Sequence, residues 1–322
     1  MSDSLAIAAP ADFHVHLRQG EFAAFLAPHV RKGGFRLAYV MPNLRPPISN
    51  TEEALLYRAQ LQAADPTIDY LMTLYLSPEL TPDEIRKAKR AGVVGVKSYP
   101  RGVTTNSDGG IESYEAYYPV FEAMEQEDMV LNLHGEVPSD ASTNICHATT
   151  RAAVECVKGL GDTVACTVTA HHLALTVDDW AGQSWHFCKP VAKYPDDRQA
   201  LQDVIKEGHP RFFLGSDSAP HPPHTKSTAS PLHACAAGVY TSAILLPLVA
   251  HLLDSFGALG RLEGFVSTYG RAFYRVPVSQ SEGKVVIRRV FGRLVEEQLV
   301  QGEQSVVPFW AGKPIGWEIV ES

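Results

Sequence analysis

Residues 11–18 read ADFHVHLR, a short apolar run that carries two histidines and is followed by an arginine. Side chains two positions apart on a β-strand point to the same face, so His14 and His16 would face together. Two imidazoles on one face at a strand end can bind a single metal ion. The other interpretation, two histidines that are only packed or exposed, stays open on this stretch alone.

Short apolar runs of this kind alternate with longer amphipathic segments along most of the chain. Their nearly continuous hydrophobicity is typical of parallel strands buried on both faces. Thr51 opens one helical pattern, and Thr81, Pro82 and two acidic residues form a helix N-terminal signature. The alternation predicts a parallel sheet, and over this length an α/β fold of the (β/α) barrel type. The predicted strands are 13–16, 36–41, 70–76, 93–99, 129–134, 164–169 and 212–216.

The part of the chain after Val276 is less regular. It contains a charged stretch around residues 288–297 and an aromatic segment at 307–317. We therefore predict a barrel domain over residues 1–275 and a C-terminal extension, residues 276–322, that packs on it.

The composition excludes several classes of partner. Of the 322 residues, 45% are hydrophobic, which is ample for a large core, and the net charge is -8. Because lysine and arginine cluster nowhere, we expect neither a nucleic-acid nor an anionic-membrane partner. The most apolar stretch, residues 243–253, contains Pro247 and His251 and is too short to span a bilayer, so it predicts a buried helix.

The first residues and the cysteines indicate where in the cell the protein would be located. Residues 1–10 lack the basic flank and the long apolar region of a signal peptide. The five cysteines are odd in number and have no CxxC spacing. They fit reduced thiols in a cytoplasmic enzyme better than a disulfide framework.

Further candidate ligands stand at the ends of other predicted strands. Lys97 ends the run 93–96, where a lysine is usually a snorkelling or edge residue. Beside two metal ions a carbamylated lysine, formed with carbon dioxide, would instead be an anion whose two oxygens can bridge them. His134 ends the run 129–133, and His147 precedes a helical pattern. Each of these histidines alone is more often structural than a ligand.

The segment GSDSAPH, residues 215–221, follows the apolar run 212–214. An aspartate at the carboxyl end of the last barrel strand lies where barrel active sites lie, although Asp217 would also suit a helix cap. Chance does not readily place six such residues at successive strand ends, so together they predict a metal site. Its predicted ligands are His14, His16, Lys97, His134, His147 and Asp217.

Seven motifs together resemble those of the single-function dihydroorotases, a family of metal-dependent amidohydrolases. The resemblance spans nearly the whole chain, and PHPPHTKS at 220–227 is similar to the fungal form. The motifs are HVHLR at 14–18, MPN at 41–43, VKSYP at 96–100, TTN at 104–106, HGE at 134–136, HATT at 147–150 and GSDSAPH at 215–221.

The resemblance implies a (β/α)8 TIM barrel of the amidohydrolase type with two zinc ions and a bridging hydroxide. One zinc would be held by His14, His16, carbamylated Lys97 and Asp217, and the other by Lys97, His134 and His147. It also implies reversible, zinc-dependent hydrolysis of the cyclic amide of L-dihydroorotate to N-carbamoyl-L-aspartate, in pyrimidine biosynthesis. The small-molecule substrate would be the chief partner, and the enzyme a cytoplasmic homodimer.

The same resemblance assigns roles around the substrate. Asp217 would be the catalytic residue that accepts a proton from the nucleophile and passes it to the leaving nitrogen. The substrate carboxylate would be gripped by Arg18, Asn43 and His221. A closing loop would carry Thr104 and Thr105, and Ala237 would contact the substrate through its backbone.

One segment departs from the family pattern. Twelve residues, 135–146, separate His134 from His147, which should end two successive barrel strands. A strand-helix-strand unit needs about 30 residues, and its connection alone at least ~10–12. We therefore expect one strand-helix unit to be missing before His147. The segment was left out of the sequence, was lost from the coding sequence, or is a true deletion.

Two other functions stay open. Another cyclic-amide hydrolase of the superfamily, such as a hydantoinase, would share the metal ligands, but the Arg18, Asn43 and His221 carboxylate grip argues against it. A catalytically dead paralogue that acts as a binding partner is supported only by the missing strand. Zinc content together with a ring-opening assay would discriminate among the three.

Overall fold

The computed structural model describes residues 4–135, 149–227, 235–278 and 283–321. Its centre is a set of parallel strands in which neighbours along the chain are also neighbours in space. All seven predicted strands are confirmed. Five form one sheet, β2 (Ala11–Val15), β3 (Leu37–Val40), β4 (Asp69–Tyr75), β5 (Gly95–Ser98) and β6 (Val130–Leu133), and a pair is formed by β7 (Cys166–Val168) and β8 (Phe212–Leu214).

The sheet curls until its first and last strands meet. Beyond the end of β8, Ser218 forms a parallel bridge with Val15 of β2. The approach is close at Gly215, where a Cβ atom would lie 2.7 Å from the side chain of Thr167 and 2.9 Å from that of His14. Only glycine fits there without a shift of the strands on either side.

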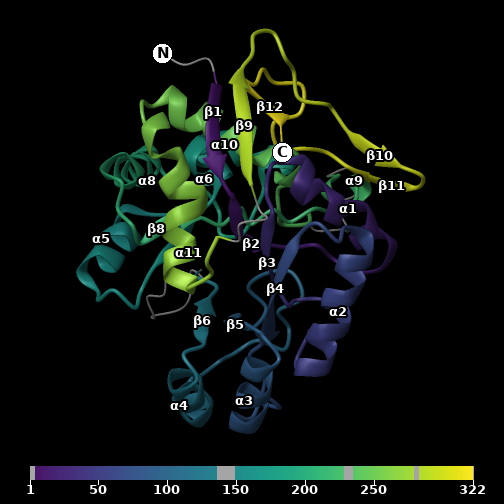
Figure 1. Cartoon of the computed structure of the whole chain (residues 1–322), viewed down its shortest axis with the longest axis vertical. Helices are drawn as coiled ribbons and strands as arrows, with labels where there is room; N and C mark the ends of the chain where they lie inside the picture. Colours follow the sequence, from purple (N-terminus) through teal and green to yellow (C-terminus); the bar gives the residue numbers. More distant parts are fainter. Residues whose placement is uncertain (1–3, 136–148, 228–234, 279–282, 322) are drawn as a thin grey trace.

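Helices cover the outside of the curled sheet (Figure 1). As predicted, one begins at Thr51, with Asn50 as its cap, and another follows Thr81, whose side chain accepts a hydrogen bond from the Glu84 amide. The longer helices are α1 (Gly20–Lys32), α2 (Thr51–Ala64), α3 (Pro82–Arg90), α4 (Tyr118–Gln126), α5 (Arg151–Gly159), α8 (Pro195–Glu207), α10 (Leu245–Ser255) and α11 (Tyr269–Tyr274). The short ones are α6 (Ala170–Ala174), α7 (Val177–Trp180) and α9 (Pro223–Lys226), with helical turns at Glu115–Tyr117, Ser184–His186, Ser242–Ile244, Leu259–Arg261 and Gly264–Thr268.

The predicted buried helix in the most apolar stretch is confirmed as α10, most of whose residues are buried. None of the described helices is long and apolar enough to cross a membrane.

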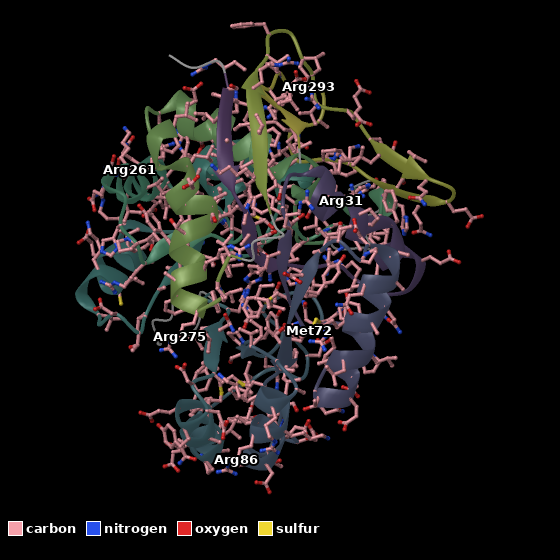
Figure 2. The ribbon with its side chains drawn as sticks, viewed as in Figure 1. Arg31, Met72, Arg86, Arg261, Arg275 and Arg293 are labelled. Carbon is pink, nitrogen blue, oxygen red and sulfur yellow. The ribbon has the colours of Figure 1, made fainter. Side chains whose placement is uncertain are left out.

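Aromatic rings fill the interior of the barrel on the side of the strands' amino ends. Phe13 stacks on Tyr274 with 4.9 Å between ring centroids and meets Phe213 edge-on at 5.5 Å. A larger apolar core lies between the strands and the surrounding helices, and it includes Met72 of β4. Figure 2 shows Met72 among packed side chains near the middle of the molecule and Arg86 at its periphery. The apolar plug leaves the carboxyl ends of the strands as the place for polar groups.

A small antiparallel sheet joins the two ends of the chain (Figure 1). In it β9 (Lys284–Arg289) lies between β1 (Ser4–Ala8) and β12 (Trp317–Glu321), and β10 (Leu299–Gln301) forms a separate hairpin with β11 (Gln304–Val306). The division into residues 1–275 and 276–322 stays a prediction. The pairing of β1 with β9 attaches the first residues to the C-terminal extension.

Among the described residues, no strand lies between β6 and β7, and no ladder pairs these two. Strand β6 is also less buried than β2, β3 and β5, whose residues are all buried, and Leu133 at its end is 38% exposed. Residues 136–148, and with them His147, lie outside the described residues. The described barrel thus has seven strands, as the missing strand-helix unit predicts.

Insertion of a strand and a helix, about 30 residues with their loops, before His147 should stabilise the protein. The added strand would pair with β6 and cover the side chain of Leu133. We expect the melting temperature to rise by about 5 °C or more in scanning calorimetry. The control is a glycine- and serine-rich insert of equal length, which should give no rise. Equal melting temperatures for all three chains would show that the barrel is complete with seven strands.

Candidate active site

Three predicted ligands converge where β2 meets the end of β8. His16 Nε2 lies 3.0 Å and His14 Nε2 lies 3.5 Å from Oδ1 of Asp217. The backbone fixes this arrangement, because the Asp217 amide donates to the His14 carbonyl at 2.8 Å and the His16 amide donates to the Ser218 carbonyl at 3.0 Å. The alternating geometry of the strand turns both imidazoles to the same side, as the HxH spacing predicts.

Asp217 is held in an unusual conformation. Its φ of 44° lies in the left-handed region, as does the φ of 60° at Arg18. Non-glycine residues rarely adopt this region, and such strain gathers at functional sites. Burial opposes the ionisation of Asp217, but the hydrogen bond with His16 holds its pKa well below the usual value.

The two histidines are held in the neutral form. Burial lowers the pKa of His14 well below its usual value, and nearby Lys97 lowers it further. Burial also lowers the pKa of His16. His16 Nδ1 lies 2.8 Å from Oδ1 of Asn43, which orients the ring with Nε2 toward Asp217. A neutral imidazole and an ionised carboxylate are the protonation states that ligate a divalent metal.

Lys97 of β5 is fully buried. Burial lowers the pKa of its amine to about 7. Its Nζ lies 3.4 Å from the carbonyl oxygen of Leu133 and 5.0 Å from the ring centroid of Tyr99. A lysine in this setting has a substantial neutral fraction near neutral pH, which a snorkelling lysine would not have.

His134 follows β6 and is buried. Its amide donates to the Ser98 carbonyl at 3.0 Å, and its ring centroid lies 5.8 Å from that of Tyr99. The side chain lines the same pocket as His16 and Asp217. The sixth predicted ligand, His147, lies outside the described residues.

The predicted carboxylate grip forms a connected group beside the ligands. His221 Nε2 lies 2.9 Å from the carbonyl oxygen of Ala237 and 3.1 Å from Nη2 of Arg18. Arg18 Nε donates to the Pro220 carbonyl at 2.9 Å. Burial lowers the pKa of His221 to about 3, so the ring is neutral. Arg18 is therefore the cation of this group, with a planar fork suited to a carboxylate.

The predicted closing loop lies over this side of the site. Asn43 Nδ2 donates to the Thr105 carbonyl at 2.9 Å, and the Asn106 side chain donates back to the Asn43 carbonyl at 2.9 Å. The buried Ser107 hydroxyl donates to the Thr104 carbonyl at 2.7 Å and braces the turn.

One pocket collects most of the predicted residues. His14 and Lys97 lie outside its lining, and His221 lines an adjoining pocket with Arg18, Asn43 and Thr105. The pocket is lined by His16, Arg18, Asn43, Tyr99, Thr104, Thr105, His134, Lys189, Asp217, Ala219, Ala237 and Gly238.

Sequence reasoning missed four of the lining residues as site residues, Tyr99, Lys189, Ala219 and Gly238. Tyr99 stands in the VKSYP motif, two positions after Lys97, which puts it on the same side of the strand. Gly238 has a φ of 147° and no room for a Cβ atom, but nothing in its neighbourhood in the sequence marks it. Lys189 is isolated in sequence from every predicted ligand.

A second group of possible ligands consists of His171, His172 and Cys188. Both ring nitrogens of His172 are engaged, Nε2 as donor to the Pro190 carbonyl at 2.9 Å and Nδ1 with the Thr169 hydroxyl at 2.8 Å. These bonds leave His172 without a free lone pair for a metal. His172 could therefore bind a metal only by giving up one of these bonds, whereas Nε2 of His14 and of His16 faces Asp217.

Comparison with known proteins finds dihydroorotases among the relatives of this chain. No family model matches the sequence. A dihydroorotase of Mycosarcoma maydis is 52% identical over 99% of this chain and 99% of its own length. A dihydroorotase of Saccharomyces cerevisiae is 36% identical, again over 99% of each chain.

Solved structures agree with these relatives. The crystal structure of dihydroorotase in complex with 5-fluoroorotic acid from Saccharomyces cerevisiae matches with a TM-score of 0.91 at 36% identity and covers 99% of both chains. An L-hydantoinase from Arthrobacter aurescens matches with a TM-score of 0.79 at 16% identity, over 98% of this chain and 83% of that one. The hydantoinase shows only that the barrel fold is shared.

The alignments also show that this chain lacks internal residues that its relatives contain. The alignment with the Mycosarcoma maydis protein has 389 positions against 322 residues here, so at least 67 positions have no residue in this chain. Because 99% of both chains is covered, these positions are internal. The alignment with the Schizosaccharomyces pombe relative has 339 positions, so at least 17 of them have no residue in this chain. These relatives therefore contain internal residues that this chain lacks.

Zinc added to the metal-free protein should raise its melting temperature, because a ligand that binds only the folded state stabilises it. Asp217→Ala should abolish the rise, since the carboxylate that both histidines face is lost. Cys188→Ala is the matched control and should keep the rise. Loss of the zinc effect in Cys188→Ala, with Asp217→Ala unaffected, would move the metal to the second group.

Proposed function

The chain belongs to the dihydroorotase family of cyclic amidohydrolases, and from this we propose that it opens and closes the ring of L-dihydroorotate with the help of two zinc ions. The observation that carries the proposal is the grouping of neutral His14 and His16 with ionised Asp217 beside a pocket that contains Arg18. The reaction would convert dihydroorotate and water to N-carbamoyl-L-aspartate, and the reverse reaction would serve pyrimidine biosynthesis.

We propose that the metal pair is held by two overlapping ligand sets. Bound divalent metals would supply a water of lowered pKa and would polarise the amide carbonyl. The described donors fit, because all are nitrogen or oxygen groups, and His14, His16 and Asp217 are in the protonation states that ligation needs. One zinc would be held by His14, His16, Lys97 and Asp217, and the other by Lys97, His134 and His147.

We propose that Lys97 takes part as its carbamate. A neutral amine adds to carbon dioxide, forming an N–C bond and releasing one proton, and leaves an anion with two oxygens. The pKa of about 7, caused by burial, keeps part of Lys97 neutral and able to react. The carbamate would also replace a buried positive charge among the ligands by a negative one, which favours divalent cations.

Asp217 would move the proton. Its carboxylate is ionised, and it lies between the two histidines at the edge of the pocket. It would accept a proton from the nucleophilic water and deliver it to the ring nitrogen as the amide bond breaks. The support for this role is the contact of the Asp217 carboxylate with His14 and His16 at the pocket.

Recognition of the substrate would rest on one cation and several neutral groups. The Arg18 guanidinium would bind the substrate carboxylate through two N–H groups, assisted by Asn43 and His221. Thr104 and Thr105 would close the pocket from above, and the Ala237 backbone would contact the ring. Hydantoins carry no such carboxylate, so the Arg18 group favours dihydroorotate over the hydantoinase alternative.

We further propose a cytoplasmic homodimer whose partner in the reaction is the small-molecule substrate. The support is the family resemblance together with the thiols of Cys156, Cys166, Cys188 and Cys235, which form no disulfide with one another. A catalytically dead paralogue, the other alternative, would fold and bind zinc without turning over dihydroorotate.

Lys97→Ala should abolish the hydrolysis of dihydroorotate and remove at least one zinc per chain, because the bridging anion is lost. A short carboxylate with bicarbonate should restore part of the activity. Turnover is measured by ultraviolet absorbance and zinc by elemental analysis. Lys89→Ala on the outer helix α3 should behave as the unchanged chain. Normal turnover in Lys97→Ala would make the lysine structural.

Arg18→Met should mainly weaken substrate binding, since a charge-assisted pair worth about 1.5–3 kcal/mol is lost. The expected result is a KM raised roughly 10-fold or more, whereas Asp217→Ala should abolish turnover in a folded protein. Steady-state kinetics and circular dichroism check both, with Arg86→Met as the surface control. Equal losses in the same kinetic constant for Arg18→Met and Asp217→Ala would contradict this division of roles.

A further inference from the structure

The loop at residues 101–107 lies closed over the pocket and is held there by side chains from other segments. Asn43 binds the Thr105 carbonyl, and Arg45 Nε donates to the Asn106 side chain at 2.7 Å. The third contact comes from Lys189, whose Nζ donates to the carbonyl oxygen of Val103 at 2.6 Å. Opening of the loop would require all three of these hydrogen bonds to break.

The contact from Lys189 differs from the other two. Its donor is an ammonium and its acceptor is the main chain of a buried residue, Val103. Charge-assisted hydrogen bonds are shorter and roughly twice as strong as neutral ones, and shielding from water strengthens them further. Arg45, the other cation, is itself exposed and reaches the half-buried side chain of Asn106 in the adjoining pocket, whereas Lys189 lines the main pocket.

The segment that carries Lys189 is fixed on both sides. The Phe187 carbonyl accepts hydrogen bonds from the Gly238 amide at 3.0 Å and from the ammonium of buried Lys226 at 2.9 Å. The Pro190 carbonyl accepts from His172 Nε2 at 2.9 Å. Lys189 therefore reaches the loop from a rigid support, so little backbone entropy is lost when it binds Val103.

Lys226 extends this support to the substrate grip. Its ammonium also donates to the carbonyls of Ala236 at 3.0 Å and Gly238 at 2.8 Å, on either side of Ala237. The Ala237 carbonyl in turn meets His221. One buried cation thus ties the segment of Lys189 to the backbone that borders the pocket.

We propose that Lys189 is a positioning residue that latches the 101–107 loop over the bound substrate. Its bond to Val103 sets Thr104 and Thr105 at the pocket wall, and its breaking is a condition for substrate entry and product release. The inference rests on the proposed function, which places the substrate in this pocket. Lys189 itself takes no part in the chemistry.

The test compares Lys189→Met with Lys189→Arg in the zinc-loaded full chain. Loss of the ammonium should speed hydrogen exchange of the 101–107 amides about tenfold and raise the Kd for 5-fluoroorotate about tenfold. Zinc content and exchange in β5 should stay unchanged. Lys189→Arg keeps a charged donor and should restore most of the loop protection. Lys193→Met is the control, because Lys193 donates to Val191 in its own segment.

The outcomes separate the latch from the function. Unchanged exchange at 101–107 in Lys189→Met overturns the latch, whatever the activity. Faster exchange with unchanged 5-fluoroorotate affinity overturns the link between latch and pocket. Loss of cooperative unfolding in both variants would give Lys189 a structural role and overturn the proposal. Absence of dihydroorotate turnover in the unchanged chain would count against the proposed function, and the exchange result would still stand.

Discussion

The site depends on the meeting of the first barrel strand with the end of the last. Two backbone hydrogen bonds, from Asp217 to His14 and from His16 to Ser218, join the strands at the point where their polar residues begin. A buried carboxylate on the strand side strengthens the joint, since Asp12 accepts from the Ser216 amide at 2.8 Å and its hydroxyl at 2.6 Å. Predicted ligands some 200 residues apart in sequence are thereby fixed within hydrogen-bonding distance.

The meeting of these strands buries several polar and charged groups together, and a metal ion would offset the free-energy cost of that burial. Their meeting brings an ionised carboxylate, two neutral imidazoles and a buried amine into an interior plugged by aromatic rings. Polar groups in such a place cost free energy unless they are paired, and charges cost more. Divalent cations would satisfy the imidazole lone pairs and the carboxylate together. The same burial that disfavours charge on Lys97 would leave the amine able to react with carbon dioxide, as the proposed carbamate requires.

Much of this could be read from the sequence, because it is local. Strand periodicity put His14 and His16 on one face, and the capping sequence at Thr81 marked the start of a helix that the structure confirms. The rule that barrel sites gather at carboxyl strand ends then brought Lys97, His134 and Asp217 together. What could not be read depends on distant contacts. The pairing of β1 with β9 and the reach of Lys189 to Val103 leave no periodic signal in the chain. The absent strand was visible only because the spacing between His134 and His147 is too short for a strand-helix unit.

The most direct test of the account is X-ray absorption at the zinc edge of the zinc-loaded chain. The account predicts nitrogen and oxygen ligands only, at about 2.0–2.2 Å, with a second zinc roughly 3.5–4 Å away. A sulfur ligand at ~2.3 Å would contradict it, because the centre at His14, His16 and Asp217 contains no cysteine, whereas the packed cluster of His171 and His172 contains Cys188.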